Sequence, residues 1–121
     1  MRRILIVEDD PSIRFVLRLI LERAGHEVLE APHGAAALVM LECELPDLVL
    51  TDLMMPVMGG SELIQRLRSD PRTSELPILV VSCNPDAIDQ LSRADGVIAK
   101  PFLPAKLLAT VASLIRVGKA V

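Results

Sequence analysis

The chain has 121 residues, of which 51% are apolar, so it is one ordinary domain with enough apolar surface for a substantial core. Its net charge of −3 gives no basic field for DNA, and no apolar run approaches the roughly 20 residues that cross a bilayer. The apolar run Ile4–Val7 ends at acidic residues and is too short for a signal peptide, so we expect a cytoplasmic protein that binds neither nucleic acid nor membranes.

The first strand and the first helix are marked by signals at their ends. Ile4–Val7 is a continuous aliphatic run, which is typical of a strand covered on both faces. Asp10 and Pro11 supply a helix cap and a first helical residue, and Gly25 ends the helix predicted at Ser12–Ala24. The apolar stripe of this helix comprises Ile13, Val16, Leu17, Ile20, Leu21 and Ala24.

The same alternation of strands and helices continues to the end of the chain. Further strands are predicted at Glu27–Ala31, Leu48–Leu50, Ile78–Val81 and Val97–Ala99, and further helices at His33–Cys43, Glu62–Arg68, Asn84–Arg93 and Pro104–Val117. No linker interrupts this (βα)₅ pattern, which predicts an α/β fold in one domain over residues 1–121, with an open parallel sheet and helices on both faces. Cys43 and Cys83 lack metal-site spacing and are interpreted as small buried residues.

Residues that can carry chemistry follow four of the predicted strands, at the edge where open parallel sheets bind ligands. Glu8 and Asp9 follow the first strand and Asp52 ends the third, while Ser82 ends the fourth and Lys100 follows the fifth. Neighbouring carboxylates stay ionised together only with a cation, and oxygen ligands suit Mg²⁺. Each of these residue types, taken alone, is also common as a helix cap or as a surface side chain. Chance alone, however, is a poor explanation for finding all of them at the same edge of one predicted sheet.

The chain resembles the receiver domains of response regulators over its full length. The resemblance rests on four spaced segments, which are Ile4–Asp10, Leu50–Gly60, Ile78–Ser82 and Ala99–Phe102. It implies a flavodoxin-like sheet with the strand order 2-1-3-4-5 and a phospho-acceptor, not an enzyme, in two-component signalling. The donor would be a histidine kinase or a histidine phosphotransfer protein, and a downstream protein would receive the signal. A weak homodimer is compatible with this role.

The resemblance also implies a role for each residue at the sheet edge. Asp52 is the phospho-acceptor, Asp9 binds Mg²⁺ directly and Glu8 binds it through water. The backbone carbonyl of Met54 is a further ligand of the metal. The residues that contact the phosphoryl group or lie beside it are Ser82, Lys100 and the cis-proline Pro101.

Several positions depart from the family pattern. Val97 stands where many receivers have an aromatic residue whose rotation reports phosphorylation, and the segment before Lys100 looks about one helical turn short. Hydrolysis of the phosphorylated Asp52 needs a water molecule oriented toward the phosphorus, and three residues near the phosphoryl group disfavour this. Met54 cannot hold the water by a strong hydrogen bond, Asn84 cannot act as a base, and Cys83 adds bulk beside the phosphoryl group. These three residues predict slow hydrolysis and a long-lived phosphorylated state.

Phe15 and Leu19 lie four residues apart on one flank of the first helix, beside its apolar stripe. Either they widen the burial of this helix against the last one, or they form a docking patch for a kinase, a phosphotransfer domain or a second copy. The sequence leaves both interpretations open.

Three other functions compete with a phosphorylation switch. Phosphatases of the haloacid-dehalogenase type need a second Asp two residues after the nucleophile, where this chain has Met54. A flavin or small-molecule module needs a phosphate-binding loop after the first strand, where this chain has acidic residues. A pseudo-receiver that acts only through protein contacts is favoured by Val97 and by the short segment before Lys100. It would not need all of the residues Asp9, Asp52, Ser82 and Lys100.

Overall fold

The computed structural model describes residues 2–52, 60–82 and 94–118. Three residues of interest, Met54, Cys83 and Asn84, lie outside this part of the chain, as does the helix predicted at Asn84–Arg93. Within the described residues, the elements follow the predicted order from the first strand to the last helix.

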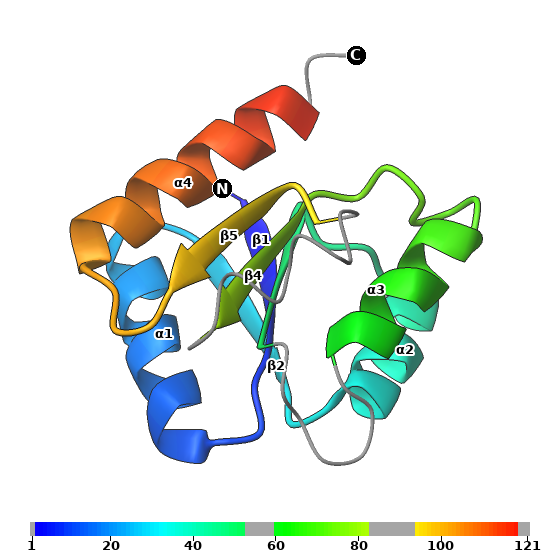
Figure 1. Cartoon of the computed structure of the whole chain (residues 1–121), viewed down its shortest axis with the longest axis horizontal. Helices are drawn as coiled ribbons and strands as arrows, with labels where there is room; N and C mark the ends of the chain where they lie inside the picture. Colours follow the sequence, from blue (N-terminus) through cyan, green and yellow to red (C-terminus); the bar gives the residue numbers. More distant parts are fainter. Residues whose placement is uncertain (1, 53–59, 83–93, 119–121) are drawn as a thin grey trace.

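The described residues form one sheet of five parallel strands (Figure 1). The strands are β1 (Arg3–Val7), β2 (Glu27–Ala31), β3 (Leu48–Asp52), β4 (Ile78–Ser82) and β5 (Gly96–Ala99). Their spatial order is β2-β1-β3-β4-β5, which confirms the flavodoxin-like α/β fold and the 2-1-3-4-5 order. The strand order reverses beside β1, so the chain leaves β1 and β3 toward opposite faces of the sheet.

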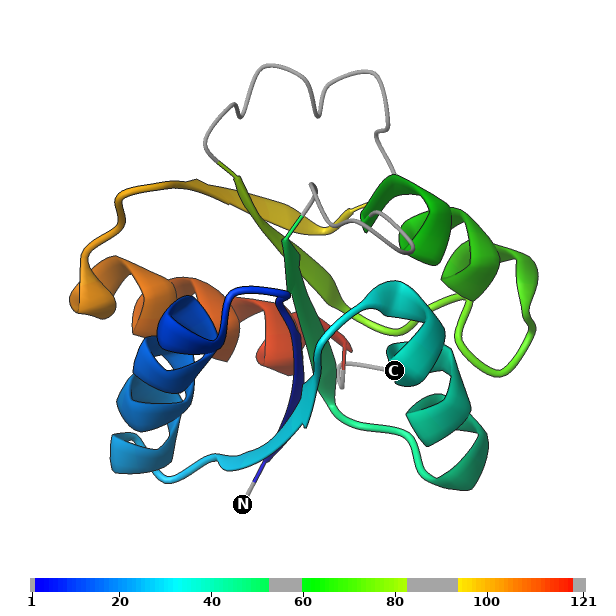
Figure 2. The ribbon, with the colours of Figure 1, turned by 90° about the horizontal axis from the view of Figure 1, so that it is seen from below.

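In the described part of the chain, each face of the sheet is covered by a pair of helices (Figures 1 and 2). α1 (Pro11–Arg23) and α4 (Pro104–Gly118) cover one face, and α2 (Gly34–Cys43) and α3 (Gly60–Ser69) cover the other. None of these helices, over the residues described, is long and apolar enough to cross a bilayer.

The core consists of two apolar layers, one on each side of the sheet. Side chains of a strand alternate between its faces, so Ile4 and Ile6 of β1 pack under α1 and α4. Leu5 and Val7 pack under α2 and α3. Every residue of β4 is buried, as expected for a central parallel strand covered on both sides.

The two ends of α1 are built as the sequence predicts, with a shift of one residue. Asp10 caps the helix, because its Oδ1 accepts hydrogen bonds from the backbone N–H groups of Ser12 at 2.8 Å and Ile13 at 3.4 Å. Pro11 is the first helical residue. At the other end, Gly25 has a φ of 94°, in the left-handed region that favours glycine. The cap fixes the turn between β1 and α1, which carries the candidate site.

The structure corrects three expectations about burial, at Val16, Ala24 and Cys43, and it decides a question that the sequence left open at Phe15 and Leu19. Ala24 is exposed rather than part of the apolar stripe, because it follows the last residue of α1. Val16 is 49% exposed rather than part of the core stripe, because it lies about 100° around the helix from the buried Leu17. Cys43 is exposed rather than buried, since it lies about 200° around α2 from the buried Leu41. Phe15 and Leu19 are 61% and 39% exposed, so they do not widen the burial of α1.

Candidate functional site

The predicted site residues lie together at the carboxyl ends of four neighbouring strands. Asp52 and Ser82 are the last residues of β3 and β4, while Glu8 and Lys100 come directly after β1 and β5. The parallel register aligns these strand ends. Ser82 is 2% exposed, and its backbone carbonyl accepts a hydrogen bond from the N–H of Lys100 at 2.8 Å. The backbone therefore holds Lys100 beside the end of β4.

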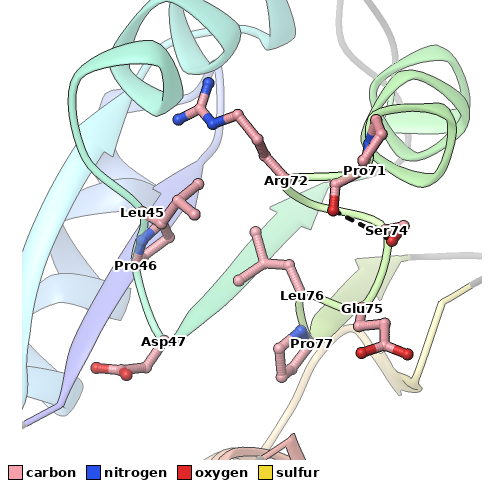
Figure 3. A pocket seen from close by; sticks show the side chains of 9 residues that line it. All are labelled: Leu45, Pro46, Asp47, Pro71, Arg72, Ser74, Glu75, Leu76 and Pro77. Atoms are coloured by element: carbon pink, nitrogen blue, oxygen red, sulfur yellow. Dashed lines mark hydrogen bonds between the residues drawn. The ribbon is translucent and has the colours of Figure 1, made fainter.

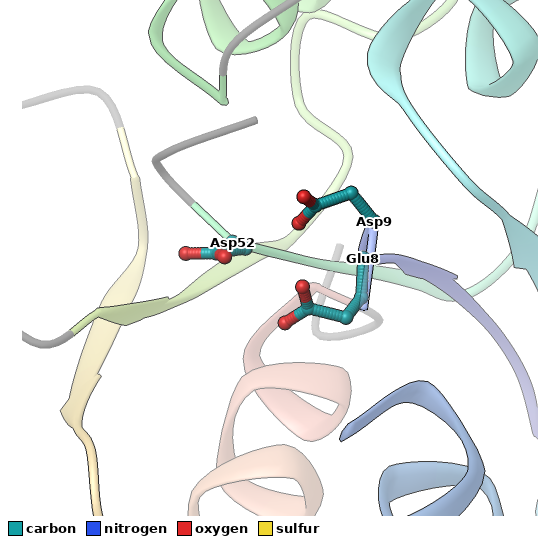
Figure 4. Close-up of side chains that lie close together, drawn as sticks. All are labelled: Glu8, Asp9 and Asp52. Atoms are coloured by element: carbon teal, nitrogen blue, oxygen red, sulfur yellow. The ribbon is translucent and has the colours of Figure 1, made fainter. Parts of the chain in front are cut away.

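Glu8, Asp9 and Asp52 form a cluster of carboxylates. One oxygen atom from each residue lies within 4.8 Å of the other two. Figure 4 shows the side chains of Glu8 and Asp9 extending from the end of β1 toward Asp52 on β3. Glu8 is buried, Asp52 is partly buried and Asp9 is exposed. The cluster is thus anchored inside the protein and open to solvent on one side.

Lys100 is the cation that this cluster shares. Its Nζ lies 3.2 Å from Oε1 of Glu8 and 3.4 Å from Oδ2 of Asp52. The side chain of Lys100 is 15% exposed, against 2% for Glu8 and 12% for Asp52. These are ion pairs of low exposure, so solvent and salt screen them far less than pairs on the surface.

Burial and charge shift the pKa values of this group. Burial raises the pKa of Glu8, and a hydrogen bond to Asp9 and the charge of Asp52 raise it further against the opposing effects of the Asp10 N–H and Lys100. Burial alone lowers the pKa of Lys100, but attraction to Glu8 and Asp52 outweighs it and the pKa is raised. Lys100 therefore stays charged, and it pairs with two of the three carboxylates in the cluster, those of Glu8 and Asp52.

The turn after β1 is held by hydrogen bonds on several sides. The N–H of Glu8 donates to the carbonyl of Ala31 at 3.1 Å, and the N–H of Asp10 donates to Oε2 of Glu8 at 3.2 Å. Nη1 of Arg14 donates to the carbonyl of Glu8 at 2.7 Å. Arg14 is not among the site residues that the sequence predicts. Its place in the second turn of a helix that starts at the site was the available signal.

The other predicted residues stand as follows. The Lys100–Pro101 peptide bond is cis. Val97 pairs with Val80 in the sheet and is 38% exposed. Phe15 and Leu19 are exposed on α1 and do not belong to the carboxylate cluster.

A pocket of about 290 Å³ lies away from these residues, at the amino ends of β3 and β4. Figure 3 shows its lining, in which Leu45 and Leu76 face the space between Pro46, Arg72 and Pro77. Nη2 of Arg72 donates to the carbonyl of Leu41 at 2.8 Å. The pocket contains none of the predicted site residues, and it lies at the sheet edge opposite to the one where such folds bind ligands.

Comparison with known sequences identifies the family. The model of the response regulator receiver domain matches residues 4–112. The chain is 38% identical over 120 residues to the DNA-binding dual master transcriptional regulator RpaA of Synechocystis sp., a match that covers 96% of this chain and 50% of the relative. The chain spans about half the length of the transcriptional regulators that it matches.

Solved structures agree with this result over almost the whole chain. The receiver domain of a signal transduction histidine kinase from Syntrophus aciditrophicus superimposes with a TM-score of 0.92 at 31% identity, covering 100% of this chain and 95% of that one. The response regulator TrrA of Thermotoga maritima, in complex with Mg²⁺–BeF, gives 0.87 at 31% identity, with 94% and 99% covered. The chain therefore belongs to the family of response regulator receiver domains, the phospho-accepting domains of two-component signalling.

Proposed function

We propose that this chain is a phosphorylation switch in which Asp52 accepts a phosphoryl group with the help of Mg²⁺. The observation that carries the proposal is the position of Lys100, whose Nζ lies 3.4 Å from Asp52 and 3.2 Å from Glu8. An ammonium at this point can pair with an anion that arrives on Asp52. In this role the chain acts in the cytoplasm and changes its own state, rather than turning over a substrate as an enzyme.

The carboxylate cluster fits a Mg²⁺ ion in both charge and donor type. Three carboxylates and one ammonium leave an excess of negative charge, and hard oxygen ligands open to water are those that Mg²⁺ prefers. Asp9 and Asp52 would bind the ion directly. Both oxygens of Glu8 already have partners, Lys100 and the N–H of Asp10, which favours binding of Glu8 through water. Bound there, the ion would neutralise charge on the phosphoryl oxygens during transfer.

The remaining residues would handle the incoming group. A carboxylate oxygen of Asp52 attacks the phosphorus of a phosphohistidine, forming a P–O bond while the P–N bond breaks and the departing imidazole takes up a proton. Lys100 then pairs with the new phosphoryl oxygens in place of the Asp52 carboxylate. The hydroxyl of Ser82, at the end of β4, would donate a hydrogen bond to one of them.

The partners would be a histidine kinase or a histidine phosphotransfer protein as donor and a downstream protein as target. Phe15 and Leu19, exposed on the helix that begins at the site, are the surface that we assign to docking of the donor. DNA binding, named for RpaA, belongs to that longer protein.

Incubation with acetyl phosphate and Mg²⁺, followed by intact mass measurement, tests the proposal. The wild type should gain one phosphoryl group that hydroxylamine removes, and EDTA or Asp52→Asn should prevent the gain, because an amide is no nucleophile. Asp10→Asn is the matched control: it makes the same change at the N-cap of α1, outside the carboxylate cluster, keeps a helix-capping oxygen and should still be labelled. A wild type that never gains phosphate from any donor would instead be a pseudo-receiver.

A further inference from the structure

Arg14 connects α1 and β2 to the turn that carries the acidic residues. Its Nη1 donates to the backbone carbonyl of Glu8 at 2.7 Å, and its Nε donates to Oε1 of Glu30 on β2 at 3.2 Å. The Arg14 and Glu30 side chains are only 22% and 27% exposed. The guanidinium is therefore held in place by a carboxylate on a rigid strand, and it holds in turn the residue that follows β1.

We propose that Arg14 is a positioning residue for Mg²⁺ binding, acting on Asp9 through the backbone. The inference rests on the proposed function, because it needs Asp9 to be a ligand of the ion. A peptide group is planar, so the carbonyl oxygen of Glu8 lies in one plane with the nitrogen and Cα of Asp9. The N–H of Glu8 is already fixed by Ala31 at 3.1 Å. With its carbonyl fixed by Arg14 as well, the direction in which the Asp9 side chain leaves the backbone is set before the ion arrives.

The charge of Arg14 alone would have the opposite effect. A guanidinium close to a cation site repels the ion, and its removal should tighten binding. Glu30 opposes this repulsion, because it pairs with Arg14 and also with Arg18, which pairs with Glu22 at 3.1 Å. Because these ion pairs offset the charge of Arg14, we expect its main effect on ion binding to be the positioning of the backbone. The sign of the change in affinity on removing Arg14 therefore separates positioning from electrostatics.

Arg18 provides a matched control for Arg14. It lies one turn further along α1, shares the same Glu30 carboxylate and is 44% exposed, and its described hydrogen bonds go to Glu22 and Glu30 rather than to the site. Arg14→Met and Arg18→Met thus make the same chemical change on the same helix. Only the first removes the hydrogen bond to the carbonyl of Glu8.

Mn²⁺ binding, followed by the paramagnetic resonance signal of the free ion, measures the effect directly, with Mg²⁺ calorimetry as a second readout. Intrinsic fluorescence offers no signal, since the chain has no Trp and no Tyr. Arg14→Met should weaken binding about tenfold, the lower end of the roughly 10- to 100-fold range for an outer-shell partner of a metal ligand. Arg18→Met should stay within about twofold of the wild type, as expected for an exposed ion pair. Arg14→Lys should recover part of the affinity, because an ammonium can still donate to the carbonyl.

Each outcome decides the matter. Equal affinities in Arg14→Met and Arg18→Met, or tighter binding in Arg14→Met, overturn the positioning role while leaving the proposed function intact. A wild type that binds no ion overturns the proposed function and this inference with it. If Arg14→Met does not unfold cooperatively in EDTA, Arg14→Lys replaces it: the charge stays, but a lysine lacks the guanidinium fork that contacts both Glu30 and the carbonyl of Glu8. Ion binding should then still weaken several-fold, and wild-type affinity in Arg14→Lys overturns the role.

Discussion

Replacing Lys100 with Met tests the charge balance of the site. Met keeps an apolar stem of similar length but removes the ammonium that Glu8 and Asp52 share. Glu8 is only 2% exposed, so its carboxylate would remain inside the protein without its counter-ion. We therefore expect the metal-free Lys100→Met variant to be less stable than the wild type at neutral pH.

The distances give the size of this effect. At an effective dielectric constant of about 20, opposite charges separated by 3.2 or 3.4 Å attract by about 5 kcal/mol. Desolvation of the ions offsets much of that attraction, and removal of one partner of a fully buried pair costs about 3–5 kcal/mol. Lys100 is 15% exposed and Glu8 can escape by taking up a proton, so we expect a loss of about 2 kcal/mol.

The pH dependence distinguishes a charge effect from a packing effect. The pKa of Glu8 is already raised by burial, and loss of Lys100 should raise it further. An acid whose pKa is raised on folding binds its proton more tightly in the folded state, so the penalty exists above the raised pKa and disappears as pH falls toward 4.5. The destabilisation by Lys100→Met should therefore be largest at neutral pH and shrink in mild acid. Added Mg²⁺ should shrink it too.

Urea unfolding followed by far-ultraviolet circular dichroism measures these stabilities, at neutral and mildly acidic pH in EDTA. Lys106→Met is the control, because Lys106 is exposed on α4 and forms no ion pair with any other described residue, so the same substitution there removes a charge at the surface. The reasoning is refuted if Lys100→Met loses no more stability than Lys106→Met, or if its loss is the same at both pH values.

Three further predictions concern other parts of the site. Asp9→Ala should lose most of the stabilisation that Mg²⁺ gives the wild type, about 1.4 kcal/mol at ten times Kd; equal melting shifts in both proteins would contradict a metal at Asp9. Val97→Ala should lower the free energy of unfolding in urea by less than about 1.5 kcal/mol, since Val97 is 38% exposed. Its phosphorylation, measured by intact mass, should equal that of the wild type. If the variant is phosphorylated normally but no longer signals to its target, Val97 transmits the change after all. Met54→Asn and Cys83→Ala should each speed the loss of phosphate from Asp52 in a mass time course, and unchanged or slower decay in both would refute shielding.

The strands could be predicted from the sequence, whereas burial on the helices could be predicted only in part. A parallel strand covered on both faces is a continuous aliphatic run, and Ile4–Val7 and Ile78–Ser82 needed no tertiary information. Helical periodicity gives the direction of an apolar stripe but not its width, which depends on how closely neighbouring helices approach. Val16 was therefore misplaced although its neighbour Leu17 was not. The strand order came from resemblance, because local patterns do not say which strands are neighbours.

In the site too, some residues could be predicted from the sequence and others could not. Glu8, Asp52 and Lys100 could be brought together from the sequence because the carboxyl ends of parallel strands share one edge, so that the fold itself supplies the proximity. Arg14 follows no such rule. Periodicity says only that it points away from the sheet, and an arginine on a polar helix face is usually a surface charge. Its contact with the carbonyl of Glu8 depends on the path of the turn after β1 and on Glu30 of β2, which approach each other only in the folded chain. Residues that hold the backbone of a site are thus harder to predict than residues that carry its chemistry, because their side-chain type does not reveal the role.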